Sequence, residues 1–194
     1  MNTNYQLSVD TGRLAIENGT ANPKWFRPDV DPHNIRNLMQ KSDAIAIRDT
    51  AIWLGMMIVS AGCAVALWPS VWSVPFWLVY GVLYGSAADS RWHECGHKTA
   101  FKTTWMNNAV YQLASFMIMR NPAIWQASHV RHHTDTIIVG RDPEIVAMRP
   151  PDLARIALAF VGVVDVYIAF KRMILHASGR IDSEEATYVA AKDH

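Results

Sequence analysis

The sequence has few cysteines and almost no net charge, and both shortages exclude classes of protein. Its 194 residues include two cysteines, Cys63 in an apolar run and Cys95 between two histidines. Two cysteines do not form the framework of a disulfide-rich secreted domain. The formal net charge is +1, so no basic field indicates nucleic acid as a partner. The glycine-rich fingerprint of flavin or nicotinamide binding is also missing.

Charge is absent from two long stretches, 51–68 and 71–88, each of eighteen residues. A membrane-spanning helix needs about 20 apolar residues, with a lower limit near 17. The link between the two runs is only Pro69-Ser70, which predicts a transmembrane helical hairpin. The sequence therefore predicts an all-α integral membrane protein.

The positive charges predict how this hairpin is oriented. Lysine and arginine are enriched on the cytoplasmic side of membrane proteins. They lie before the first run and after the second, but not in the turn: Lys24, Arg27, Arg36, Lys41 and Arg48, then Arg91, Lys98 and Lys102. We therefore expect a multi-pass protein whose N-terminus and histidine-rich segments face the cytoplasm.

The chain divides by composition into three expected regions. Residues 1–49 are polar and predict a cytoplasmic arm, mostly irregular up to residue 30 and helical over 33–47, where Asp31-Pro32 is a helix-start signal. Residues 50–176 form the membrane domain, with a possible third apolar helix at 153–170. Residues 177–194 are polar and predict a cytoplasmic segment.

The segments that follow the second span carry similar signals. We expect the first histidine cluster to continue the helix of the second span. Residues 105–119 predict an interfacial or re-entrant helix. Asn121-Pro122 repeats the cap-plus-proline signal and opens a further helix, and a turn is expected over 140–143.

Five of the eight histidines fall in two short boxes. The first contains His93 and His97, and the second contains His129, His132 and His133. Residues three and four apart share a helix face, so each box can direct its imidazoles at one point. Neutral imidazole is a common nitrogen donor for iron, zinc and copper. The spacing therefore predicts metal binding. Cys95 lies two residues from either histidine of its box and is expected on a different face, as a bystander.

The first box alone fits a second chemistry. His93-Glu94-x-x-His97 matches the H-E-x-x-H pattern of zinc peptidases, in which the glutamate is the general base. A zinc hydrolase uses three protein ligands and one open position, so five histidines exceed its needs. Five or more nitrogen donors suit two metal ions better than one.

Together the boxes resemble those of the membrane fatty acid desaturase family, whose superfamily also contains alkane and carotenoid hydroxylases. The likeness rests on both boxes, on Trp125-Gln126-Ala127-Ser128 before the second, and on Thr134-Asp135-Thr136 and Asp142-Pro143 after it. It covers roughly residues 25–190.

The resemblance implies an O2-dependent di-iron oxidoreductase that introduces a double bond into an acyl lipid. It implies that the iron ligands are His93, His97, His129, His132 and His133. Glu94, Asp135 and Arg131 are candidates for orienting these ligands. The expected partners are an acyl lipid substrate, membrane lipids and an external electron donor of the ferredoxin or cytochrome type.

The chain departs from the family in one respect. Members carry a third histidine box after a second pair of membrane helices, whereas His33, His176 and His194 are isolated here. We therefore expect an N-terminal part of a desaturase, with an incomplete metal site and no activity alone. Three alternatives stay open: an alkane or lipid hydroxylase, a membrane zinc metallopeptidase, and a non-catalytic metal-binding remnant.

Overall fold

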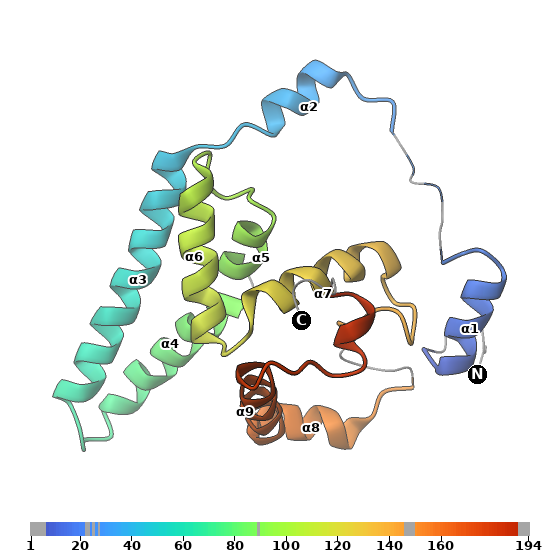
Figure 1. Cartoon of the computed structure of the whole chain (residues 1–194). Helices are drawn as coiled ribbons and strands as arrows, with labels where there is room; N and C mark the ends of the chain where they lie inside the picture. Colours follow the sequence, from blue (N-terminus) through green and yellow to red (C-terminus); the bar gives the residue numbers. More distant parts are fainter. Residues whose placement is uncertain are drawn as a thin grey trace. The chain divides into compact units, whose positions relative to one another are not determined.

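The structure is a computed structural model that describes residues 7–21, 24, 26, 28–88, 90–145 and 150–189, without the side chains of residues 88 and 160. Over these residues the regular secondary structure is helical and contains no strand, which confirms the all-α prediction. The chain forms two compact units, Asp29–Arg120 and the combination of Met1–Pro28 with Asn121–His194. Figure 1 labels the helices of both, and each unit is described by itself.

Among its described residues, the unit Asp29–Arg120 contains five α-helices and one 3-10 turn. They are α2 (Pro32–Leu38), α3 (Asp43–Ala66), α4 (Ser73–Gly85), η2 (Ser86–Ala88), α5 (Ser90–Gly96) and α6 (Thr104–Met117). Here α3 packs against α4, and α5 packs against α6.

The predicted helix 33–47 is wrong in its extent, because the chain breaks between α2 and α3. The start was correct, since the Asp31 carboxylate accepts the amide of His33 at 2.8 Å, with Pro32 in the first turn. The break follows Met39, and Ser42 then caps α3 by accepting the amide of Ile45. A serine with an extended backbone favours a new helix start over continuation of the old one.

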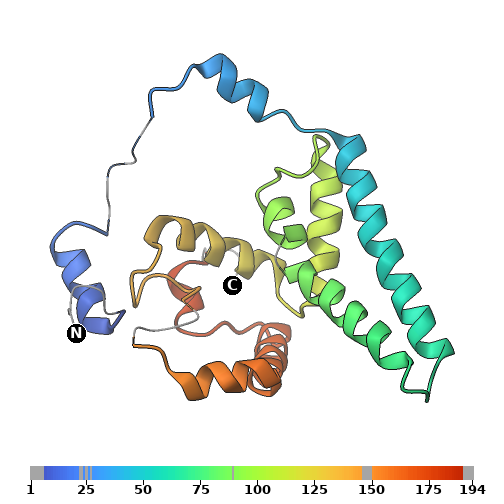
Figure 2. The ribbon, with the colours of Figure 1, turned by 180° about the vertical axis from the view of Figure 1, so that it is seen from behind.

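Helices α3 and α4 lie side by side as a hairpin in both views (Figures 1 and 2). The Trp53 indole nitrogen donates to the carbonyl of Leu83 at 2.8 Å and ties the two helices together. Within the described residues, one helical segment, ending at Ala66, is long and apolar enough to cross a membrane. Helix α4 has 13 residues, about 20 Å at 1.5 Å per residue, against a hydrocarbon core of about 30 Å. The crossing of a second span therefore stays a prediction.

The first histidine box does not continue the second span, which corrects that expectation. Helix α4 ends at Gly85 and the 3-10 turn η2 follows it. Within this turn the Ser86 hydroxyl donates to the carbonyl of Leu83 at 2.7 Å. A serine that bonds back to the preceding turn competes with regular helical pairing. The box therefore has its own short helix, α5.

The other unit contains α1 (Val9–Glu17), α7 (Pro122–Asp135), α8 (Leu153–Val161), α9 (Val163–Ala177) and the 3-10 turn η3 (Glu185–Thr187). Helix α1 corrects the expectation of an irregular arm: Ser8 and Thr11 form a reciprocal capping box that starts it. The start of α7 was predicted correctly, since the Asn121 side chain accepts the amides of Ala123 and Ile124.

The expected third apolar helix is two helices. Gly162 has φ +69° and ends α8, and α9 starts at the next residue. The two axes differ in direction by 72°, a bend that is visible in Figure 1, where α9 is seen almost end-on. Glycine is suited to this position because it adopts positive φ at little cost.

Candidate metal-binding site

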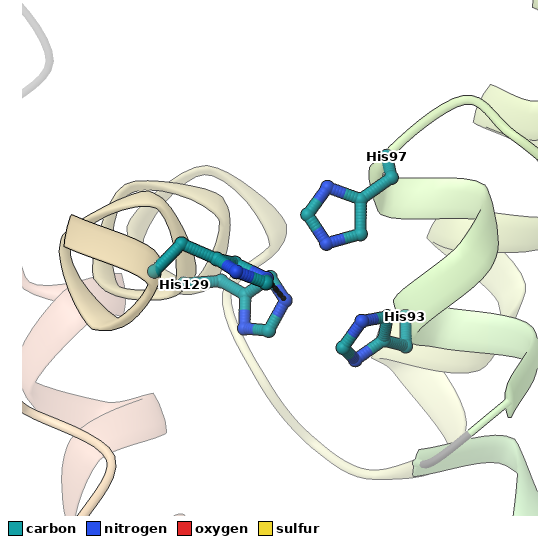
Figure 3. Close-up of side chains that lie close together, drawn as sticks. His93, His97 and His129 are labelled. Carbon is teal, nitrogen blue, oxygen red and sulfur yellow. Dashed lines mark hydrogen bonds between the residues drawn. The ribbon is translucent and has the colours of Figure 1, made fainter. Parts of the chain in front are cut away.

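The first histidine box projects from one side of α5. The rings of His93 and His97 are 4.8 Å apart between centroids, and Figure 3 shows both leaving the same side of the helix. His93 is half-buried and His97 is exposed. The amide of His97 donates to the carbonyl of His93 at 3.1 Å, which continues the helical turn past Gly96. The predicted i, i+4 alignment is confirmed.

The other side of α5 packs against α6. Trp92 and Cys95 are 3% and 2% exposed, and the Trp92 ring lies 5.8 Å from that of Tyr111. A Cβ on Gly96 would stand 3.1 Å from the Tyr111 ring, so glycine permits the close approach. Burial, and then the neighbouring Glu94 charge, raise the pKa of the Cys95 thiol to about 11. A neutral, buried thiol is a poor metal ligand, in agreement with the bystander interpretation.

The second box is a three-histidine cluster on α7. The Nε2 atoms of His129 and His133 are 3.1 Å apart, and the His132 ring centroid lies 5.8 Å from each of the other two. His129 is buried, His132 is half-buried and His133 is exposed. Figure 3 shows the His129 ring extending from α7. The predicted i, i+3, i+4 grouping on one helix face is confirmed.

Two carboxylates after α7 hold two of these imidazoles. Glu144 accepts from Nδ1 of His129 at 3.0 Å and from the Ser128 hydroxyl at 3.0 Å. Asp142 contacts Nδ1 of His132 at 2.9 Å. An ionised carboxylate only accepts hydrogen bonds, so Nδ1 carries the proton in both rings. The Nε2 atom of each of these two rings is then left without a proton and can accept a hydrogen bond or bind a cation.

Asp142 is itself fixed by the turn that carries it. Its carboxylate accepts the amide of Ile137 at 2.8 Å and the amide of Glu144 at 2.9 Å. Ile137 has φ +68°, an unusual conformation for a β-branched residue. The turn predicted over 140–143 is present, with Gly140 at φ +86°. It brings both acids back to the helix.

Asp135 forms ion pairs with two arginines. Its fully buried carboxylate lies 2.7 Å from Nε of Arg131, as an ion pair, and 3.0 Å from Nε of Arg141. This triad ties the turn to the end of α7. Glu94 is exposed, and its backbone carbonyl accepts from the amide and hydroxyl of Thr99. A role of Glu94 and Asp135 in orienting the imidazoles stays a prediction.

Sequence reasoning missed Glu144, and it used Asp142 only as family context. Glu144 lies 15 residues after His129, and Asp142 lies 10 after His132. The available signal was an acidic pair just after a glycine turn that follows a histidine box. Such acids commonly receive the second nitrogen of a ligating imidazole.

The second box fits a divalent metal in its donor chemistry. A metal–imidazole bond is about 2.0–2.1 Å, so two nitrogens at a right angle on one ion are about 3 Å apart. The Nε2 atoms of His129 and His133 are hydrogen-bonded to each other at 3.1 Å, a separation that is also close to this value. The two acids behind the rings add negative charge, which favours a cation. The class defined by these features is a helical protein whose histidine boxes are compatible with a metal ion.

Comparison with known proteins gives the family. Residues 66–187 match the family model described as fatty acid desaturase, and the chain belongs to that family. The match includes both histidine boxes and both carboxylates of the turn. None of the solved structures matches the chain significantly.

Three curated plant proteins are among its relatives. A bifunctional fatty acid conjugase/Delta(12)-oleate desaturase of Punica granatum is 31% identical over 126 residues, 62% of this chain and 31% of that protein. An omega-6 fatty acid desaturase, endoplasmic reticulum isozyme 1, of Glycine max is 27% identical over 62% of this chain and 31% of its own length. A Delta(12)-fatty-acid desaturase of Arabidopsis thaliana is 26% identical, over 70% and 36%. The chain thus spans about a third of each relative.

Proposed function

We propose that this chain carries part of the metal centre of an O2-dependent fatty acid desaturase, which introduces a double bond into the acyl chain of a lipid. The proposal rests on family membership. The observation that carries it is the second box, in which two imidazoles are oriented through Nδ1 by Glu144 and Asp142. Orientation of this kind is typical of metal ligands.

All five box histidines are proposed as iron ligands: His93, His97, His129, His132 and His133. Two irons, when bound, supply with dioxygen the oxidising power that amino-acid side chains lack for an unactivated C–H bond. The role of the chain is to present neutral imidazoles at fixed positions. Five donors exceed the requirement of one ion with open positions, so we propose that the boxes together serve two irons.

The two carboxylates have distinct positioning roles in this proposal. Glu144 fixes the ring of His129 and is itself fixed by Ser128. Asp142 fixes the ring of His132 and is held by two backbone amides. Each keeps the proton on Nδ1, so that the Nε2 lone pair is available to a cation.

The proposed partners follow from the family and from the apolar helix α3. The curated relatives are named for Delta(12), omega-6 and oleate desaturation; for this chain we propose an acyl lipid as substrate. Electrons are proposed to come from an external donor of the ferredoxin or cytochrome type. The N-terminus and both boxes are proposed to face the cytoplasm, in a multi-pass membrane protein.

The test is product analysis in a host membrane. The chain is expressed with a ferredoxin and its reductase, and the fatty acids of the host lipids are analysed by gas chromatography and mass spectrometry. A new double bond that disappears in His129→Gln supports the proposal. A new hydroxyl group would indicate the hydroxylase, and peptide hydrolysis abolished by Glu94→Gln would indicate the zinc peptidase. Either of these products contradicts the desaturase proposal. If no product forms, iron analysis of the purified chain decides: bound iron that is lost in His129→Gln supports a part of the metal centre, and a chain that binds no iron contradicts it.

A further inference from the structure

Helices α8 and α9 expose an unusual amount of apolar surface. Neither helix contains a buried residue among its described side chains. Twelve large apolar side chains are exposed: Leu153, Ile156, Leu158, Val161, Val163, Val164, Val166, Tyr167, Ile168, Phe170, Met173 and Ile174. Soluble monomers rarely expose contiguous apolar patches of more than a few hundred Å2. We therefore expect this apolar surface to be in contact with another apolar phase or surface.

Helix α9 has two distinct sides. At about 100° per residue, Asp165, Arg172 and His176 fall within an arc of about 40°. The opposite side carries the apolar face of α9, defined here as Val163, Val166, Tyr167, Phe170, Met173 and Ile174. Its members are between 43% and 67% exposed.

The polar side of α9 is already occupied by the chain itself. His176 contacts both carboxylate oxygens of Glu185, at 3.0 and 3.1 Å. Arg172 lies 3.6 Å from the Asp182 carboxylate. Asp182 also accepts the amide of Glu185 at 2.8 Å, which shapes the turn η3. Residues 182–185 thus cover the polar side, and the apolar face of α9 points the other way.

The lengths of the two helices exclude a straight crossing. Helix α8 has 9 residues and α9 has 15, about 14 and 22 Å at 1.5 Å per residue. A bilayer core is about 30 Å thick, and the axes diverge by 72° at Gly162. Helices with one strongly apolar face commonly lie in the plane of the interface.

Two residues at the edge of the apolar face also suit a lipid interface. Tyr167 and Lys171 are neighbours on the helix surface and both are exposed. Tyrosine prefers the boundary between apolar chains and headgroups. Lysine can lay its alkyl stem along apolar surface while its ammonium reaches a headgroup phosphate.

We propose that α8 and α9 form an in-plane elbow on the lipid bilayer. The apolar face of α9 enters the acyl region, and its polar side, with residues 182–185, faces the water. The proposal goes beyond the desaturase reaction and uses none of the histidine boxes. It assigns an anchoring surface that lies outside the α3–α4 hairpin.

Spin-label accessibility tests this arrangement in the full chain, reconstituted in nanodiscs of phosphatidylcholine and phosphatidylglycerol. Cys63→Ala provides the background, since the remaining Cys95 is buried and 2% exposed; this background, treated with the label, is the blank. Single cysteines replace Val163, Phe170 and Ile174 on the apolar face, and Asp165 on the polar side. Collisions with oxygen and with a water-soluble nickel chelate give the depth of each label. Circular dichroism verifies that each variant keeps its helix content.

The in-plane elbow predicts one shallow depth for all three apolar positions. Their labels collide more with oxygen than with nickel, and the label at position 165 shows the reverse. A depth that changes steadily from 163 to 174 would overturn the proposal in favour of a crossing helix. Low collision rates with both reagents would also overturn it, because another protein surface would then cover the face. Neither readout involves catalysis, so failure of the desaturase proposal remains distinguishable.

Discussion

The two histidine boxes are held in place by different means. In the second box, the imidazoles of His129 and His132 are backed by Glu144 and Asp142 through hydrogen bonds of 3.0 and 2.9 Å. In the first box, the structure positions the whole helix: Trp92 and Cys95 are buried, and Gly96 allows α5 to approach Tyr111. In the second box, carboxylates hold two of the three rings individually; in the first, packing holds the helix that carries the rings.

This difference determines which substitutions disturb each box. Removing the Glu144 carboxylate releases the ring of His129 and the Ser128 hydroxyl, with little effect on the fold, whereas Asp142 also holds two backbone amides of the turn. Changing the α5–α6 contact moves the backbone that carries both His93 and His97. The first kind of change should affect metal affinity, and the second should affect stability as well.

The largest expected effect is removal of a proposed ligand from either box. His97→Ala and His133→Ala should each weaken the affinity for ferrous iron by more than about 100-fold, the upper end of the loss seen for residues behind ligands. The measurement is competition for ferrous iron with a chelator of known affinity. His33→Ala, outside both boxes, is the control. Unchanged affinity after substitution in one box would show that this box holds no iron.

A smaller loss is expected when one carboxylate of the second box is neutralised. Glu144→Gln should weaken metal affinity by about 10–100-fold. The neutral amide replaces the charged carboxylate that accepts the hydrogen bond from Nδ1 of His129, so the ring is held less firmly. The measurement is competition for ferrous iron with a chelator of known affinity. Glu184→Gln, an exposed glutamate of the same unit, is the matched control. Equal affinity in both variants would contradict the positioning role.

The packing of the first box is tested at Gly96. In Gly96→Ala the new Cβ would lie 3.1 Å from the Tyr111 ring, so the ring must give way within the packed contact between α5 and α6. Overpacking of this kind costs about 1–3 kcal/mol. The measurement is the urea midpoint followed by circular dichroism in detergent. Gly62→Ala, with nothing within 4 Å of its Cβ, should show no loss. A similar midpoint in both variants would refute the packing argument.

The smallest effect concerns acid sensitivity in the unit of the first box. The hydroxyl and then the amide of Thr103 hold the pKa of Asp43 below its ordinary 3.8. A carboxylate whose pKa is lower in the folded chain than in the unfolded chain stabilises the fold at pH values above its unfolded-state pKa. This contribution is lost as the pH falls through the folded-state pKa. Thr103→Val removes the hydroxyl. The urea midpoint of this variant should be slightly lower than that of the wild type at neutral pH, and the two midpoints should converge below pH 3.8. The check is urea unfolding across that range; an equal gap at every pH would contradict it.

Local signals predicted the boxes and the helix starts, but not the contacts between distant segments. The i, i+4 spacing and the Asn121-Pro122 start were enough to place the imidazoles of the second box on α7. The break before α3 was missed because Ser42 competes with an otherwise continuous apolar period. The sequence did not predict the role of Glu144, because its hydrogen bond to His129 depends on the path of the turn between them. The first box was misplaced on a longer helix, since no residue type alone reveals the turn η2.

Mössbauer spectroscopy of the full chain loaded with iron-57 tests the central claim most directly. The account predicts iron with nitrogen-rich coordination, lost in both His97→Ala and His133→Ala, while His33→Ala retains it. Iron that persists unchanged after substitution of either box would contradict the proposed role of that box. Exclusive zinc binding that depends on His93 and His97 but not on the second box would contradict the desaturase assignment of the site.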